Sequence, residues 1–158
     1  SLQTEYKNRT ITAVLDAIDG SPAKSALLNA CTNSKIPVVT CGGAAGRLDP
    51  SAIVCRDLTK VTDDKLLCQC RKDLRKHYGY PRGKAFREKG YTRPWRIPAI
   101  YSEECIPNIP AAASSKSNLR QCDGALGTAC FVTGTCGFMA ASQIVTAIAQ
   151  DSLKPPRR

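Results

Sequence analysis

The sequence has few residues of the kinds that build metal centres and disulfide frameworks. It contains a single histidine, His77, and no two cysteines in a C-x-x-C spacing. Because structural zinc needs several cysteine or histidine ligands at close spacing, we expect no structural zinc. The nine cysteines are odd in number and irregularly spaced, which argues against a disulfide framework and favours reduced thiols in a cytosolic compartment.

Features of exported and membrane-spanning proteins are also scarce. The chain starts at Ser1 without a charged-then-apolar leader, so we expect no secretory signal and a processed or truncated start. Residues 128–150 carry no charge and are long enough to span a membrane. Their many Gly, Ala, Ser and Thr residues favour instead a helix buried in the core or in a subunit interface. We therefore expect a cytoplasmic protein, with a mitochondrial association as the alternative.

Acidic residues are outnumbered, with 13 Asp and Glu against 23 Lys and Arg, and the net charge is +10. Between Arg71 and Arg96 there are ten basic residues and two acidic ones, a local charge of +8, together with five of the nine aromatics. Such a concentration predicts binding to a polyanion such as RNA. A solvated helix face followed by a flexible basic loop is the alternative. The candidate RNA-binding residues are Arg71, Lys72, Arg75, Lys76, Arg82, Lys84, Arg87 and Lys89.

The stretch from Ile11 to Cys31 predicts a buried strand, a turn and a helix. An apolar run ends at Leu15, two acids follow at Asp16 and Asp19, and Ser21 is placed to cap a helix that begins with proline. Carboxylates at the carboxyl end of a strand, facing a helix N-terminus, are where open α/β sheets bind ligands. The alternative is that both acids only cap the turn.

The remaining segments predict a single α/β domain over residues 1–158. Strands are expected at 36–40, 52–58 and 97–101, with the first of them parallel to the strand before it. Helices are expected from Asp63 to about 78 and over 128–150, and a basic loop over 79–96. The glycine run 42–46 lacks the Lys-Ser/Thr of a phosphate-binding loop, so we expect it to serve close backbone packing.

Four segments carry a resemblance to a known family. In order they read VLDAIDGSPAKSALL, IPVVTCGGAAGRLDP, IYSEE and QCDGALGTACFVTGTCGFMAAS. Together they resemble the tRNA threonylcarbamoyladenosine dehydratase family, which belongs to the superfamily of ThiF, MoeB and ubiquitin-activating enzymes. The resemblance covers residues 11–150. It implies the C-terminal part of a Rossmann-like ThiF-type fold, with a mixed sheet and flanking helices.

The resemblance also implies an activity. Members of the family use ATP to adenylate the carboxylate of threonylcarbamoyladenosine in tRNA and then cyclise it, which implies ATP and Mg²⁺ as cofactors and tRNA as the partner. Separately, the small residues of the final helix favour a homodimer interface. Asp19 is implied as a catalytic and metal-binding carboxylate, with Asp16 beside it on the cofactor side. Cys122 is implied either as a nucleophile or as a residue that lines the pocket.

One motif of the family is absent from this sequence. The G-x-G-G-x-G-S loop that holds the ATP phosphates does not occur, so we expect the chain to be inactive alone, with the N-terminal half in another chain or removed. Two other functions compete with the dehydratase: adenylation of a ubiquitin-like or sulfur-carrier protein, and a non-catalytic RNA-binding fragment. A ubiquitin-like partner favours a hydrophobic docking groove, whereas the basic window favours RNA.

Overall fold

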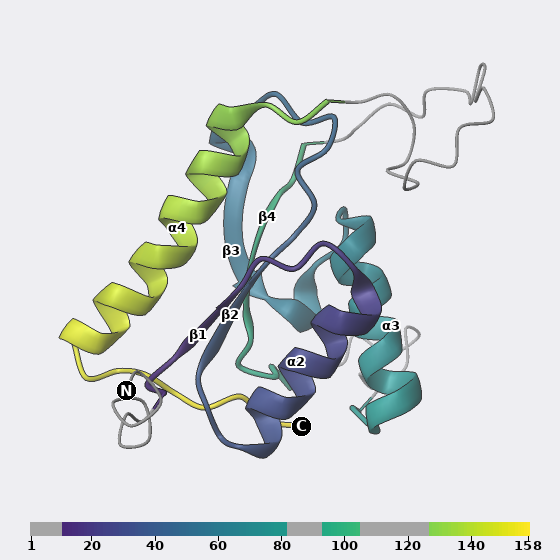
Figure 1. Cartoon of the computed structure of the whole chain (residues 1–158), viewed down its shortest axis with the longest axis vertical. Helices are drawn as coiled ribbons and strands as arrows, with labels where there is room; N and C mark the ends of the chain where they lie inside the picture. The colour runs from purple at the N-terminus through teal and green to yellow at the C-terminus, as the bar shows by residue number, and fades with distance from the viewer. Residues whose placement is uncertain (1–10, 82–92, 105–126) are drawn as a thin grey trace, which may run out of the picture.

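The structure is a computed structural model that describes residues 11–81, 93–104 and 127–158 (Figure 1). Within these residues, helices and strands alternate along the first half of the chain, and one long helix ends it. The strands and α-helices are β1 (Val14–Asp16), α2 (Ser21–Asn33), β2 (Val38–Cys41), β3 (Ile53–Asp57), α3 (Lys65–Tyr78), β4 (Pro98–Ser102) and α4 (Cys130–Ala149). Two short 3₁₀ turns, η1 (Pro50–Ala52) and η2 (Leu58–Lys60), flank β3.

The four strands form one mixed sheet in the order β1-β2-β4-β3. β1 pairs parallel with β2, with Val14 opposite Val38, and β2 pairs parallel with β4, with Thr40 opposite Ala99. β3 runs antiparallel to β4 at the far edge. The predicted mixed sheet with a parallel first pair is therefore confirmed.

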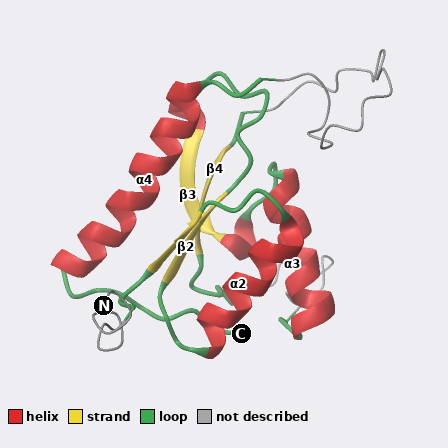
Figure 2. Ribbon diagram, viewed as in Figure 1, coloured by secondary structure: helices red, strands yellow, loops and turns green. Residues whose placement is uncertain are grey.

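Helices cover both faces of the sheet (Figure 2), with α2 and α3 on one face and α4 on the other. Successive residues of β2 point to opposite faces, so Val38 joins the apolar cluster beneath α2 and α3, and Val39 joins the cluster beneath α4. In the same way Tyr101 of β4 joins the first cluster and Ile100 the second. Two thin cores thus hold three layers together.

Helix α3 begins and ends where its sequence specifies. The Asp64 carboxylate accepts the N–H of Leu67 and caps the first turn, and Gly79, at φ 68°, closes the last turn in the left-handed conformation that glycine favours. Leu67, Cys70 and Leu74 form the buried stripe. The predicted start of this helix is confirmed, and Leu66, next to the stripe, is half-buried.

The glycine run after β2 packs tightly against the start of α3. A Cβ atom at Gly42 would lie 2.3 Å from Oδ2 of Asp64 and 3.0 Å from Cβ of Tyr101. The same Asp64 oxygen accepts the N–H of Gly43 at 2.8 Å. Only a residue without a side chain fits at position 42, so the expected role of the run in close backbone packing is confirmed.

The start of the sheet differs from the expectation. β1 has only three residues, Ile11 and Leu15 are 60% and 42% exposed, and the N-cap of α2 is Gly20 rather than Ser21. The physical reason for the exposure is that β1 lies at the edge of the described sheet, where no other described strand pairs with its outer side.

The long final helix is not buried in the core of this chain, which corrects one of the two expectations for residues 128–150; burial in a subunit interface stays a prediction. Of its residues only Val132 and Ala140 are buried, and Phe138 is 81% exposed. A Cβ atom at Gly134 or Gly137 would meet nothing within 4 Å, so these glycines serve no close packing within this chain. Length and composition alone would let α4 cross a membrane, but its inner side packs on all four strands of the sheet.

The two ends of the basic loop are anchored in the core. Tyr80 and Trp95 are 3% and 1% exposed, with ring centroids 4.8 Å apart in an edge-to-face arrangement. These two aromatics are therefore unavailable to stack on RNA bases. The C-terminal residues also pack here, because Arg157 donates its N–H to the carbonyl of Trp95 and Arg158 lies over the Tyr80 ring.

Candidate functional site

The carboxyl ends of β1, β2 and β4 lie at one edge of the sheet (Figure 1). The N-termini of the helices reach the same edge. α2 follows β1 directly, Asp64 ties the start of α3 to Gly43, and the N–H of Gly46 bonds the carbonyl of Gly127, three residues before α4. Strand carboxyl ends beside helix N-termini, which carry partial positive charge, are suited to an anionic ligand.

A buried lysine connects the first two strands at this edge. Lys24 of α2 is fully buried, and its Nζ donates to Asp16 Oδ2 at 2.8 Å, to Thr40 Oγ1 at 3.0 Å and to the carbonyl of Cys41 at 2.9 Å. Thr40 in turn donates its hydroxyl to the same oxygen of Asp16 at 2.7 Å. All three ammonium protons thus have acceptors, which a buried charge requires.

The two sequence-predicted carboxylates have different surroundings. Asp16 is 1% exposed, and its second oxygen accepts the N–H of Ile18 at 3.0 Å, so both of its oxygens are occupied by the protein. Asp19 is exposed and makes no hydrogen bond or ion pair with the described part of the chain. The N-cap of α2, Gly20, offers no side-chain cap either. Asp19 is therefore the carboxylate that a ligand can reach.

A second buried charge ties β2, β4 and α3 together. The guanidinium of Arg47 donates to the carbonyls of Gly43, Ser102, Glu104 and Asp63, and one of its nitrogens lies 3.8 Å from Oδ2 of Asp64. Burial raises the pKa of the Asp64 carboxyl, whereas its two backbone hydrogen bonds and the Arg47 charge oppose that rise. These contacts fix the floor of the site and leave neither group free for chemistry.

The described cysteines near this edge are poor nucleophiles. Burial raises the pKa of the Cys41 thiol to about 11, and burial also raises the pKa of Cys136. Both thiols therefore stay protonated at neutral pH. Cys55 and Cys130 are exposed. Cys122 lies outside the described residues, and α4 begins only at Cys130.

The candidate RNA-binding residues divide into three groups. Arg71 donates to the carbonyls at the end of η2, and the guanidinium of Arg75 lies 5.4 Å from the centroid of the Trp95 ring, so both serve the fold. Lys72 and Lys76 are exposed on the same helix. The other four, Arg82, Lys84, Arg87 and Lys89, lie outside the described residues.

Sequence reasoning missed Lys24, Thr40 and Arg47. The sequence contains one indication of the role of Lys24, because this lysine is the lone charge in an otherwise apolar helical stretch that follows two acids. No sequence pattern indicates the role of Arg47, because its partners are backbone carbonyls from three segments far apart in the chain.

The site fits a weakly held divalent cation better than a dedicated metal cage. Within the described ranges, no group of three or more His, Cys, Asp or Glu side chains is placed to hold a metal ion. Mg²⁺ bound to nucleotides usually takes one or two carboxylates and completes its shell with phosphates and water. The exposed carboxylate of Asp19, which has no hydrogen bond or ion pair with the described residues, meets that requirement.

Comparisons with known proteins agree with this geometry, although no family model matches the chain. The tRNA threonylcarbamoyladenosine dehydratase of Haemophilus influenzae is 34% identical over 145 residues, which are 90% of this chain and 52% of the relative. The protein of that name from Escherichia coli is 32% identical over 147 residues, 87% of this chain and 52% of the relative.

Solved structures give the same result. The Escherichia coli dehydratase TcdA in complex with ATP superposes with a TM-score of 0.70 at 30% identity, over 94% of this chain and 52% of that one. Its complex with AMP gives a TM-score of 0.69, over 89% and 49%. The fold is thus the ThiF-type, Rossmann-like fold that the sequence predicted. More particularly, the chain is homologous to tRNA threonylcarbamoyladenosine dehydratase and spans about half the length of the relatives that it matches.

Replacing Lys24 with methionine should destabilise the chain strongly. Lys24→Met keeps the length of the side chain but leaves the Asp16 carboxylate buried without its cation, which costs about 3–5 kcal/mol of the free energy of unfolding. Urea denaturation measures this loss. Lys65→Met, at the exposed first residue of α3, is the matched control and should change the free energy by less than about 0.5 kcal/mol. A loss below about 1 kcal/mol for Lys24→Met would show that the network does not hold the edge.

Proposed function

We propose that this chain provides one side of the active site of an ATP-dependent enzyme that modifies tRNA. The enzyme adenylates the carboxylate of threonylcarbamoyladenosine, and the activated carboxyl then cyclises with loss of AMP. The observation that carries the proposal is the free Asp19 carboxylate at the carboxyl edge of the sheet, in a fold whose solved relative is a complex with ATP.

The chain's own residues have defined parts in this reaction. Lys24 and Asp16 hold the turn after β1 so that Asp19 faces the ligand edge. Asp19 would hold Mg²⁺, which when bound offsets the negative charge of the ATP phosphates. The uncapped first turn of α2 adds backbone N–H groups beside it, and such groups favour anions.

The phosphate-binding loop comes from a further half of the enzyme. β1 has an unpaired outer side within the described sheet, and Ile11, Leu15 and Ile18 are exposed along it. Because parallel sheets are normally covered on both faces and continued by further strands, we place the missing half of the family's length along β1. That half lies on another chain or on a longer form of this one.

The outer face of α4 is suited to pairing with a second copy. Phe131, Phe138 and Val145 recur every seven residues on its exposed side, and Ile148 extends the stripe. Residues 128–150 carry no charge, so two copies of a chain with net charge +10 could meet here without like-charge repulsion. The expected homodimer is therefore retained as part of the proposal, in a cytoplasmic protein. The relatives reported above are bacterial and give no support to a mitochondrial association.

The experiment for the reaction uses a chimera. The part of the Escherichia coli relative that precedes its match to this chain is fused ahead of residue 11, and AMP and the cyclised nucleoside are measured with ATP, Mg²⁺ and modified tRNA. Asp19→Asn should lower the rate about a hundredfold or more, the scale on which one electrostatic contact in an active site contributes. Asp151→Asn, which removes an exposed carboxylate just after α4, is the matched control and should leave the rate unchanged.

Three results of this assay would contradict the proposal. Full activity of Asp19→Asn would remove the role of that carboxylate. Release of AMP only in the presence of a ubiquitin-like or sulfur-carrier protein would support the competing adenylating function. Binding of tRNA without release of AMP would leave an RNA-binding fragment.

Binding of tRNA should depend on the two exposed lysines of α3. In Lys72→Gln/Lys76→Gln, the loss of two phosphate contacts should lower the slope of log affinity against log salt by about two. Filter binding at several salt concentrations measures this slope. Lys65→Gln, at the opposite end of the same helix, should leave it unchanged. Equal slopes for the unsubstituted chain, Lys72→Gln/Lys76→Gln and Lys65→Gln would show that the RNA binds elsewhere.

A further inference from the structure

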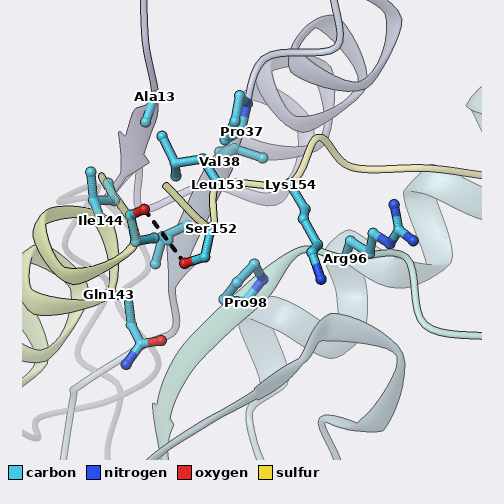
Figure 3. A pocket seen from close by; sticks show the side chains of 12 residues that line it. Ala13, Pro37, Val38, Arg96, Pro98, Gln143, Ile144, Ser152, Leu153 and Lys154 are labelled. Atoms are coloured by element: carbon cyan, nitrogen blue, oxygen red, sulfur yellow. Dashed lines mark hydrogen bonds between the residues drawn. The ribbon is translucent and has the colours of Figure 1, made fainter. Parts of the chain in front are cut away.

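A cavity of about 250 Å³, drawn in Figure 3, is lined by residues at the amino ends of the parallel strands, the opposite end from Asp19. Its walls come from the amino ends of three strands, near Ala13, Val38 and Pro98, from the last turns of α4, and from residues 152–154. Its volume is slightly below the roughly 300–1,000 Å³ of typical small-molecule sites. A ligand of few atoms would therefore fill it.

The walls of the cavity are mainly apolar. Aliphatic groups of both sheet and helix line it, from Pro37, Val38, Val39, Pro98, Ile144, Ala147 and Leu153. Two uncharged polar side chains also line the cavity. Ser152 donates its hydroxyl to the carbonyl of Ala147 at 3.4 Å. Gln143 lies on the opposite side of the cavity from the charged residues (Figure 3). Such walls favour an apolar ligand body.

Two cations flank one side of this apolar cavity. Arg96 and Lys154 both line the cavity, are drawn on the same side of it in Figure 3, and are exposed. Neither side chain has a hydrogen bond or ion pair with residues 11–81, 93–104 or 127–158, and none of the described residues that line the cavity is acidic. Both charges are therefore available to an anionic group.

The backbone at Arg96 is held in a conformation that is costly for arginine. Its φ is 58°, in the left-handed region that glycine and asparagine adopt most readily. The Asp57 carboxylate enforces this conformation from both sides, because its two oxygens accept the N–H groups of Trp95 and Ile97 at 3.1 and 3.3 Å. An arginine thus occupies a strained position although its side chain forms no hydrogen bond or ion pair with the described residues, and strain of this kind collects at binding sites.

We propose that this cavity binds a small amphiphilic anion, with its aliphatic or aromatic body between the sheet and α4 and its carboxylate or phosphate paired with Arg96 and Lys154. The charge of the two cations and the apolar walls together specify this class of ligand. The site is separate from the proposed reaction at Asp19, because it lies at the other end of the same parallel strands.

The test measures binding of eight-carbon probes to the chain by calorimetry. Octanoate should bind at least tenfold more tightly than octanol, since a charge-assisted pair is lost with the alcohol. Arg96→Asn/Lys154→Gln should weaken octanoate binding at least tenfold, and asparagine tolerates the positive φ, so the fold is kept. Ala147→Phe, which fills the cavity, should abolish binding. The matched control is Lys35→Asn, which removes one charge at another residue of positive φ, 56°, outside the lining, and it should change the affinity less than twofold.

Octyl phosphate distinguishes the two head groups. Tighter binding of octyl phosphate identifies a phosphate monoester as the anion, and tighter binding of octanoate identifies a carboxylate; either result, with the pattern above, supports the proposal. No binding of either anion, equal binding of octanol, or unchanged affinity in Arg96→Asn/Lys154→Gln would overturn it. If Ala147→Phe fails to fold, the exposed Arg96→Asn/Lys154→Gln variant still decides the question.

Discussion

The edge of the sheet that carries the candidate site depends on one buried ammonium group. Lys24 projects from α2 into the space between β1 and β2 and donates to three acceptors there, one on β1 and two on β2. Without it, Asp16 and Thr40 would be buried side by side without a cation, and the turn that leads to Asp19 would lose its anchor. All members of this network must be present together, because burying any one of them without its partner costs free energy. It therefore specifies one arrangement of α2 against the two strands.

The Arg47 and Asp64 pair repeats this arrangement on the other side of the edge. Arg47 reaches backbone carbonyls at the ends of β2 and β4 and at the start of α3. Asp64 caps α3 and at the same time bonds Gly43. Buried charges thus hold the carboxyl edge, whereas apolar contacts hold the rest of the sheet to its helices. An edge fixed in this way presents Asp19 and the helix N-termini in constant positions to a ligand.

Much of this architecture could be predicted because its causes are local. The apolar stripe of α3, its Asp64 cap and the β-branched run of β2 each specify their element within a few residues. The glycines after β2 were predicted to pack closely for the same reason. Recognition of the family depended on four longer segments, and relatives of that name confirm it.

What could not be predicted depends on contacts between distant segments. The exposure of α4 and of Leu15 in β1 follows from surfaces that the described chain leaves without a partner, and no local pattern reveals that. The partners of Arg47 lie 4, 16, 55 and 57 residues away. Burial of Tyr80 and Trp95 arises because α2, α3 and the C-terminal residues meet around the ends of the basic loop. Tyr80 and Trp95 therefore belong to the core and not to an RNA surface.

The central claim is that the nucleotide site is complete only when a second half of the enzyme joins this chain at β1. Calorimetric titration of ATP with Mg²⁺ tests it most directly, with the chain alone in one experiment and the chimera with the Escherichia coli half in the other. The account predicts no measurable heat of binding for the chain alone and a saturable isotherm for the chimera. Equal affinity of the chain and the chimera for ATP would contradict it.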